Sequence, residues 1–198
     1  MTTLADMQAL VVGQTRRPEV PEITDAAIRS ATLRAHHVDF FPRDLAQHTL
    51  SYAIANSPFY DFTGVSAQLA RLRSIKTVTS VDAQGQPVEQ FEFREASDLF
   101  DADGYRRPHV YTLLGDTLRV FPVMQTGALG VHFYQNPVLT GFQYSSWIAT
   151  TYPDELAMWA ASIVFARTGF LEMANTFQNQ HVIPFREMLI ASHLLGGA

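Results

Sequence analysis

Two adjacent histidines, His36 and His37, are the first residues whose chemistry could hold a metal ion. Neighbouring residues on a helix point about 100° apart, so both imidazoles cannot easily bind one ion. Asp39 is close in sequence, but no regular ligand spacing completes a set. The pattern therefore predicts no metal site, and we interpret the two histidines as a surface or interface pair.

The stretch Asp101-Ala102-Asp103-Gly104 resembles the start of a calcium-binding loop. Such a loop needs a glutamate at its twelfth position, where this chain has Thr112. We therefore interpret the stretch as a polar turn and not as a cation site.

Motifs for nucleophilic or phosphate chemistry are absent from the sequence. It contains no cysteine, no Gly-x-Ser-x-Gly elbow and no phosphate-binding glycine loop. A thiol nucleophile and a cysteine-based zinc site are therefore excluded. The sequence predicts no catalytic residue and no cofactor, so we do not expect an enzyme.

Four residues are better candidates for protein contacts. Arg106 and Arg107, beside Tyr105, could touch nucleic acid or an acidic partner, although two charges are few and a solvated loop is the simpler interpretation. Tyr144 and Trp147 lie in the polar stretch YSSW and are of the types that anchor interfaces. These four residues are the candidates for contact with another protein chain.

Composition places the chain among globular proteins. Of its 198 residues, 47% are hydrophobic and 17% are charged, which is enough for one domain with a core. The net charge of −5 argues against a protein that binds nucleic acid through the phosphate backbone. No apolar run is long enough to span a membrane, no signal-peptide pattern is expected, and the absence of cysteine fits a reducing compartment.

Helical periodicity marks both ends of the chain. Residues 3–15 predict one helix, and a second is expected to begin with Thr24 as its N-cap. Residues 153–180 predict a long helix that starts at Pro153 and is loosened or ended by Gly169. The residues expected to face the core are Leu4, Met7, Leu10, Val11, Ile28, Ala31, Ala35, Val38, Leu156, Trp159, Ile163, Phe170, Ala174 and Phe177.

The middle of the chain changes to the period of a strand. Alternating apolar residues predict about five strands in an antiparallel meander. The clearest pair is the hairpin 110–122, where Gly115-Asp116 suits a type II′ turn. That turn sets Tyr111 opposite Val120, and its register also pairs Leu113 with Leu118, Val110 with Phe121 and Thr112 with Arg119.

These elements predict an α+β fold in which N- and C-terminal helices form a bundle with a small antiparallel sheet inserted between them. We expect a single domain over residues 1–198, with helices at about 3–40 and 153–183 and a β region at about 44–139. Pro184 is expected to break or kink the last helix and to separate a segment at about 185–198.

The ordered set of elements resembles the head-to-tail adaptor (connector) proteins of tailed bacteriophages. The resemblance rests on the segment AHHVDFFPRDL at 35–45, the hairpin Tyr-x-x-x-Gly-Asp-x-Leu-Arg-x-Phe-Pro at 111–122 and the strand VHFYQNPVL at 131–139. The helix start SSWIATTYPDEL at 145–156 completes it. The resemblance covers nearly the whole chain.

This resemblance implies a structural virion protein in the neck, between head and tail. It implies a ring of about twelve copies that binds the portal protein and contacts tail or nozzle proteins. Genome DNA is expected to pass through the lumen of the ring without specific binding, and no membrane partner is expected. Twelve copies at −5 carry about −60, which would let DNA slide. Alternatives are a head-completion or tail-terminator ring and, more remotely, a small-ligand-binding domain or an enzyme.

The resemblance also implies that the chain end reaches into the portal. The segment's apolar residues are the expected docking residues, namely Phe185, Met188, Leu189, Leu194 and Leu195. The other interpretation is that this segment is simply the last helix of the bundle.

Overall fold

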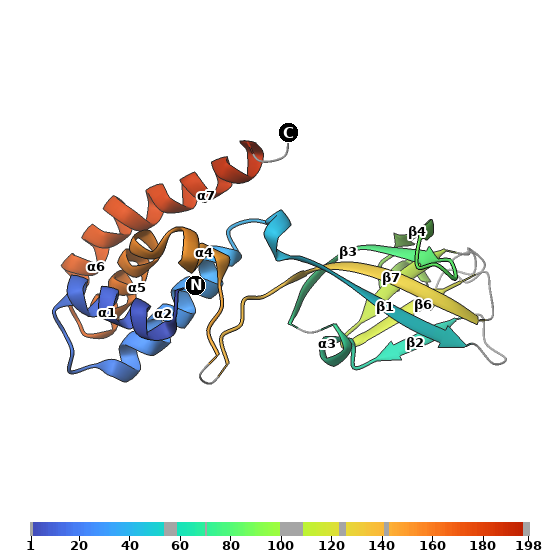
Figure 1. The fold of residues 1–198 in the computed structure, drawn as a ribbon, viewed down its shortest axis with the longest axis horizontal. Helices are drawn as coiled ribbons and strands as arrows, with labels where there is room; N and C mark the ends of the chain where they lie inside the picture. The colour runs from blue at the N-terminus through green and yellow to red at the C-terminus, as the bar shows by residue number, and fades with distance from the viewer. Residues whose placement is uncertain are drawn as a thin grey trace. The chain divides into compact units, whose positions relative to one another are not determined.

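The computed structural model describes residues 2–53, 59–69, 71–99, 109–122, 126–140 and 143–195. The chain forms two compact units, drawn in Figure 1. A helical unit is built from both chain ends, Met1–Asp44 and Asn136–Ala198, and a β unit is built from Leu45–Gln135. This mixture of helix and sheet confirms the α+β class.

The helical unit contains α-helices, one short 3₁₀ turn and one π-helical turn among its described residues. In chain order these are α1 Leu4–Thr15, α2 Pro21–His36, a 3₁₀ turn Pro42–Asp44, α4 Trp147–Thr151, α5 Pro153–Arg167, α6 Leu171–Phe177, a π-helical turn Gln178–Val182 and α7 Ile183–Leu195.

The first helix begins and packs as its sequence predicts. The Thr3 hydroxyl accepts the Asp6 backbone N–H at 3.2 Å, and the Asp6 carboxylate accepts the Thr3 N–H at 2.8 Å. This capping box satisfies two N–H groups that a helix start leaves without partners. Met7 and Val11 are fully buried on the predicted face.

The second helix begins earlier than predicted. It starts at Pro21, so Thr24 lies inside it, and the Thr24 hydroxyl donates to the Val20 carbonyl at 3.0 Å. The prediction of Thr24 as N-cap is therefore wrong, because proline has its φ preset for the first helical turn and needs no hydrogen-bonded N–H there. The predicted small-residue face is confirmed, since Ala31 and Ala35 are fully buried.

The C-terminal helices differ from the prediction at two residues. Gly169, with φ +85°, ends α5 as expected, but Phe170 at the following turn is 45% exposed, so its predicted core position is wrong. Arg17 lies over its ring, 4.2 Å from the centroid. Pro184 does not break the helix, because a π-helical turn precedes it, in which the Ile183 N–H donates to the Gln178 carbonyl.

The β unit contains seven strands among its described residues. They are β1 Leu45–Ala53, β2 Tyr60–Thr63, β3 Leu72–Val81, β4 Pro87–Phe93, β5 Val110–Leu114, β6 Thr117–Phe121 and β7 Thr126–Gln135. A short helix α3 Val65–Gln68 and a 3₁₀ turn Ala96–Leu99 connect some of them.

The order of the strands corrects the predicted meander of about five. The sheet runs β1-β7-β3-β4-β5-β6-β2, and β4 pairs with β5 in parallel. A meander contains only antiparallel neighbours, so this parallel pair contradicts it, and β2, with four residues, carries too short an alternation to be predicted. The β5–β6 hairpin has all four predicted pairings, and Gly115 has φ +61° as its turn type requires.

Candidate functional site

Trp147, a predicted contact residue, is held in place by a buried carboxylate. It begins α4, directly after the N-cap Ser146. Its indole Nε1–H donates to Asp44 Oδ1 at 2.8 Å, and its ring lies edge-on to Phe41 with centroids 5.3 Å apart. The ring is only partly buried, so one part is fixed by the protein and another remains open.

His36 extends this arrangement into the core of the helical unit. Its Nδ1–H donates to both Asp44 oxygens at 2.9 Å, and its Nε2 forms a hydrogen bond with the Ser146 hydroxyl at 2.9 Å. His36 is only 2% exposed, so the interpretation of both histidines as a surface pair is wrong for it. His37 is exposed and bonds to Asn136 Oδ1 at 2.7 Å. We call His36, Asp44, Ser146 and Trp147 the Asp44 network.

Three members of the Asp44 network have the order of a Ser-His-Asp triad. A nucleophilic serine must be reachable by its substrate. Ser146 is only 6% exposed, and its Oγ already accepts the Ala149 N–H at the start of α4. The arrangement therefore positions Trp147 and joins α2 to α4. Sequence analysis missed it because His36 and Ser146 are 110 residues apart.

A small cavity of about 270 Å³ opens beside Trp147. Arg43 lies over the Trp147 ring, with its guanidinium carbon 5.1 Å from the ring centroid. The cavity is lined by Phe41, Pro42, Arg43, Trp147, Thr151, Tyr152 and Ser192. We call it the Trp147 cavity. Among the described residues, its wall has one cationic side chain, no anionic one, and three aromatic rings.

Tyr144, another predicted contact residue, lies inside the helical core. It is 8% exposed, and its hydroxyl forms a hydrogen bond with Thr32 Oγ1 at 2.8 Å. Burial raises the pKa of Tyr144, although the Thr32 hydrogen bond and the Arg29 charge act against this. The ring therefore packs within its own chain and offers little surface to a neighbour.

The predicted docking residues fall into two groups on α7. Phe185 and Leu189 are buried in the helical core, as the last-helix interpretation predicts. Met188 is 37% exposed. Ile183 and Ile190, which sequence analysis missed, are also exposed; seven residues apart, they lie on one face of α7 and could have been found by that spacing.

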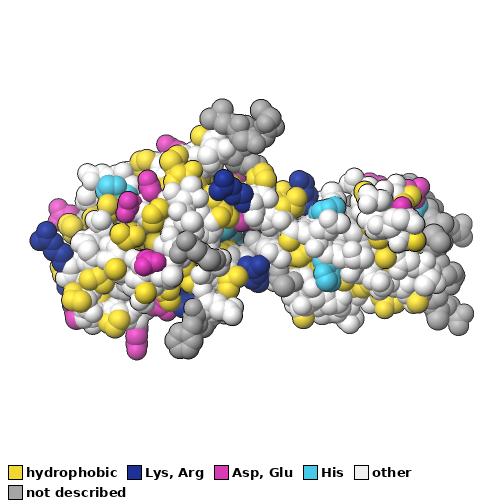
Figure 2. All heavy atoms as spheres, viewed as in Figure 1, with side chains coloured by type: hydrophobic (Ala, Val, Ile, Leu, Met, Phe, Trp, Pro, Cys, Tyr) yellow, Lys and Arg dark blue, Asp and Glu magenta, His cyan; other side chains and the backbone are white. Residues whose placement is uncertain are grey.

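Figure 2 shows apolar side chains along the visible face of the helical unit, over α7 as well as elsewhere. The side chains of Leu194 and Leu195 lie outside the described residues, as do Arg106, Arg107 and the Asp101–Gly104 stretch.

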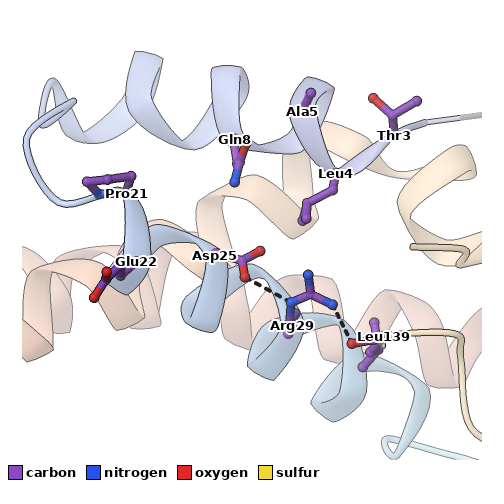
Figure 3. A pocket seen from close by; sticks show the side chains of 9 residues that line it. All are labelled: Thr3, Leu4, Ala5, Gln8, Pro21, Glu22, Asp25, Arg29 and Leu139. Carbon is purple, nitrogen blue, oxygen red and sulfur yellow. Dashed lines mark hydrogen bonds and ion pairs between the residues drawn. The ribbon is translucent and has the colours of Figure 1, made fainter. Parts of the chain in front are cut away.

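A larger cavity of about 910 Å³ is lined by the first turns of α1 and by the first half of α2 (Figure 3). Asp25 Oδ2 accepts from Arg29 Nε at 3.0 Å, and Arg29 Nη1 donates to the Leu139 carbonyl. Arg29 thereby ties the segment after β7 to α2. These bonds give Arg29 and Asp25 Oδ2 a structural role in the wall.

The β unit has its own cavity, of about 790 Å³, near the β3–β4 turn. Tyr52 and Phe91 supply apolar wall, and His109 Nε2 lies 2.7 Å from the Glu89 carboxylate. Val88, on the same wall, is 63% exposed. These residues form a second surface on which a protein partner could pack.

Neither metal nor membrane features occur in the described part of the chain. Within it, no three residues among His, Cys, Asp and Glu come together as a metal site. No helix there has the length and apolar character needed to cross a membrane.

Comparison with known proteins agrees with an adaptor. The family profile described as SU10 adaptor protein matches residues 2–181, which covers the whole β unit and the helical unit as far as residue 181, before α7 begins. No curated protein matches the chain.

Proposed function

We propose that this protein binds the portal protein and joins the head of a bacteriophage to its tail. The chain belongs to the SU10 adaptor protein family and is a structural phage adaptor. The family match carries the proposal. In this role the chain sits in the neck of the virion, as part of a ring of about twelve copies with cyclic symmetry. Its terminal helices form a bundle with the sheet inserted between them.

The exposed half of α7 supports portal binding. Phe185 and Leu189 anchor the helix in its own core, so the helix needs no partner to be ordered. Ile183, Met188 and Ile190 nevertheless remain 37–41% exposed. Ile183 and Ile190 share one side of α7 and Met188 lies on another, and exposed apolar side chains of this kind are typical of surfaces that other proteins cover.

The electrostatics support DNA passage through the ring. A charge of −5 on each copy gives about −60 for twelve copies. A channel with net negative charge repels phosphates, so duplex DNA can move through it without being held. Tail or nozzle proteins then contact the β unit, whose cavity and exposed Val88 are available to them.

The experiment compares binding of the purified adaptor to purified portal rings by biolayer interferometry. Ile190→Glu and Met188→Glu place a charge on exposed parts of α7, so folding is retained and affinity is expected to fall at least about tenfold. Val88→Glu, on the β unit, is the matched control and is expected to bind as the wild type does. Wild-type protein that fails to bind portal would overturn the proposed function.

A further inference from the structure

We infer that the Trp147 cavity is a second binding site for the portal protein. The cavity receives an acidic side chain from the same portal segment that covers α7. The inference rests on the proposed function and names a chemistry for its partner. Its starting point is the cavity's wall, in which a tryptophan, a tyrosine and an arginine meet. These are the residue types that most often dominate the energy of protein interfaces.

The size of the Trp147 cavity favours a side chain as its occupant. Its volume of about 270 Å³ is below the range of about 300–1,000 Å³ typical of small-molecule sites. The Trp147 ring is fixed before binding, because Asp44 accepts its indole N–H at 2.8 Å and Phe41 packs against its edge. A wall that is already rigid costs less free energy to bind than a mobile one.

The positive charge of Arg43 favours an acidic side chain as the occupant of the Trp147 cavity. Arg43 is exposed, stacks over the Trp147 ring, and forms no ion pair with any carboxylate in the described residues. The Asp44 carboxylate next to it in sequence is buried and already accepts from His36 and Trp147. A guanidinium that pairs with no carboxylate of the described residues can bind a carboxylate of a partner through its fork of donors.

Continuity with α7 identifies the partner. Ser192 lines the cavity, and Met188 lies four residues before it on α7, so the two side chains are neighbours on the helix surface. A protein segment that covers Met188 therefore runs directly to the Trp147 cavity. DNA is a poorer fit, because one arginine among aromatic walls offers a duplex few phosphate contacts.

The test measures binding of full-length adaptor variants to purified portal rings. Arg43→Glu should weaken binding about tenfold and reduce its dependence on NaCl, whereas Arg43→Lys should weaken it less than about threefold. Arg34→Glu is the matched control, since Arg34 is exposed on α2 and does not line the cavity. Ser192→Trp, which fills the cavity from α7, should weaken binding without altering charge.

Three outcomes would overturn the inference. Arg43→Glu could bind portal as Arg34→Glu does, could lower affinity for duplex DNA instead, or could lower self-association of the adaptor measured by mass photometry without portal. In each case the wild type still binds portal, so the proposed function survives. If the wild type does not bind portal, the proposed function fails and this inference fails with it.

Discussion

The helical unit and the β unit are stabilised in different ways. The main core of the β unit consists of apolar residues from alternating strand positions, such as Leu129, Val131 and Phe133 on β7. The helical core also encloses three residues of the Asp44 network. His36, Asp44 and Ser146 are each less than 10% exposed and are joined by hydrogen bonds. Apolar alternation can be read directly from the sequence, whereas a buried polar network depends on contacts between distant segments.

The largest effect is expected from Trp159→Ala in the helical core. Trp159 is 5% exposed and packs edge-on to Phe185, with ring centroids 6.3 Å apart. Truncating a buried tryptophan typically costs about 3–5 kcal/mol of unfolding free energy. Thermal unfolding of Leu171→Ala, at a position 64% exposed, should stay within about 0.5 kcal/mol of the wild type.

The same variant distinguishes one cooperative domain from two units. Both tryptophans, Trp147 and Trp159, belong to the helical unit, so fluorescence reports on that unit, while far-ultraviolet circular dichroism also follows the sheet. The predicted single domain requires both signals to change in one transition, shifted together by Trp159→Ala. A fluorescence transition that shifts alone would show that the β unit unfolds separately.

A smaller effect is expected from Asp44→Ala. The substitution leaves the His36 Nδ1–H and the Trp147 Nε1–H buried without their acceptor, which should cost about 3 kcal/mol. Asp44→Asn keeps one oxygen acceptor in the same shape, so it should cost about half as much. Denaturant unfolding followed by fluorescence measures both, and equal stability of Asp44→Ala and the wild type would show that the network does not stabilise the fold.

Particular residues show how far the sequence predicts the fold. The hairpin register was predictable because the type II′ turn at Gly115 determines every pairing that follows. The start of α2 was mispredicted because Thr24 and Pro21 are both good start signals, and local propensity does not decide between them. The order of the strands was mispredicted because pairing between distant strands has no local signature.

The candidate site was predictable only in part. Trp147 was found by residue type, but its partner Asp44 is 103 residues away and was not. Met188 was found as one of the apolar residues of the segment at about 185–198, whereas Phe185 and Leu189, found on the same ground, turn inward. Which side of a helix is covered depends on the neighbouring helices, and no residue type encodes that alone.

Replacing one glycine in each unit by alanine should change the free energy of unfolding by about 1 kcal/mol, with opposite signs in the two units. A Cβ on Gly127 of β7 would lie 2.7 Å from the hydroxyl oxygen of Tyr52, which is 6% exposed, so Gly127→Ala should cost about 1–2 kcal/mol. A Cβ on Gly13 of α1 meets nothing within 4 Å, so Gly13→Ala should stabilise by about 0.5–1 kcal/mol. Urea unfolding of both variants, followed by circular dichroism, checks the opposite signs; effects of one sign would contradict the steric argument.

The smallest effect is expected at alkaline pH from Tyr144→Phe. Burial raises the pKa of Tyr144 in the folded helical unit above the value of about 10 that it has when unfolded. Above pH 10 the unfolded chain therefore releases this proton first, and the stabilisation present below pH 10 is lost as pH rises through the folded pKa. One such group contributes at most about 1.4 kcal/mol per pH unit. Phenylalanine cannot ionise, so Tyr144→Phe should lose less stability than the wild type between pH 10 and 11 in fluorescence-detected unfolding.

The matched control is Tyr111→Phe in the β unit, because burial raises the pKa of Tyr111 too. This variant should change the fluorescence transition, which reports on the helical unit, only if the two units unfold together.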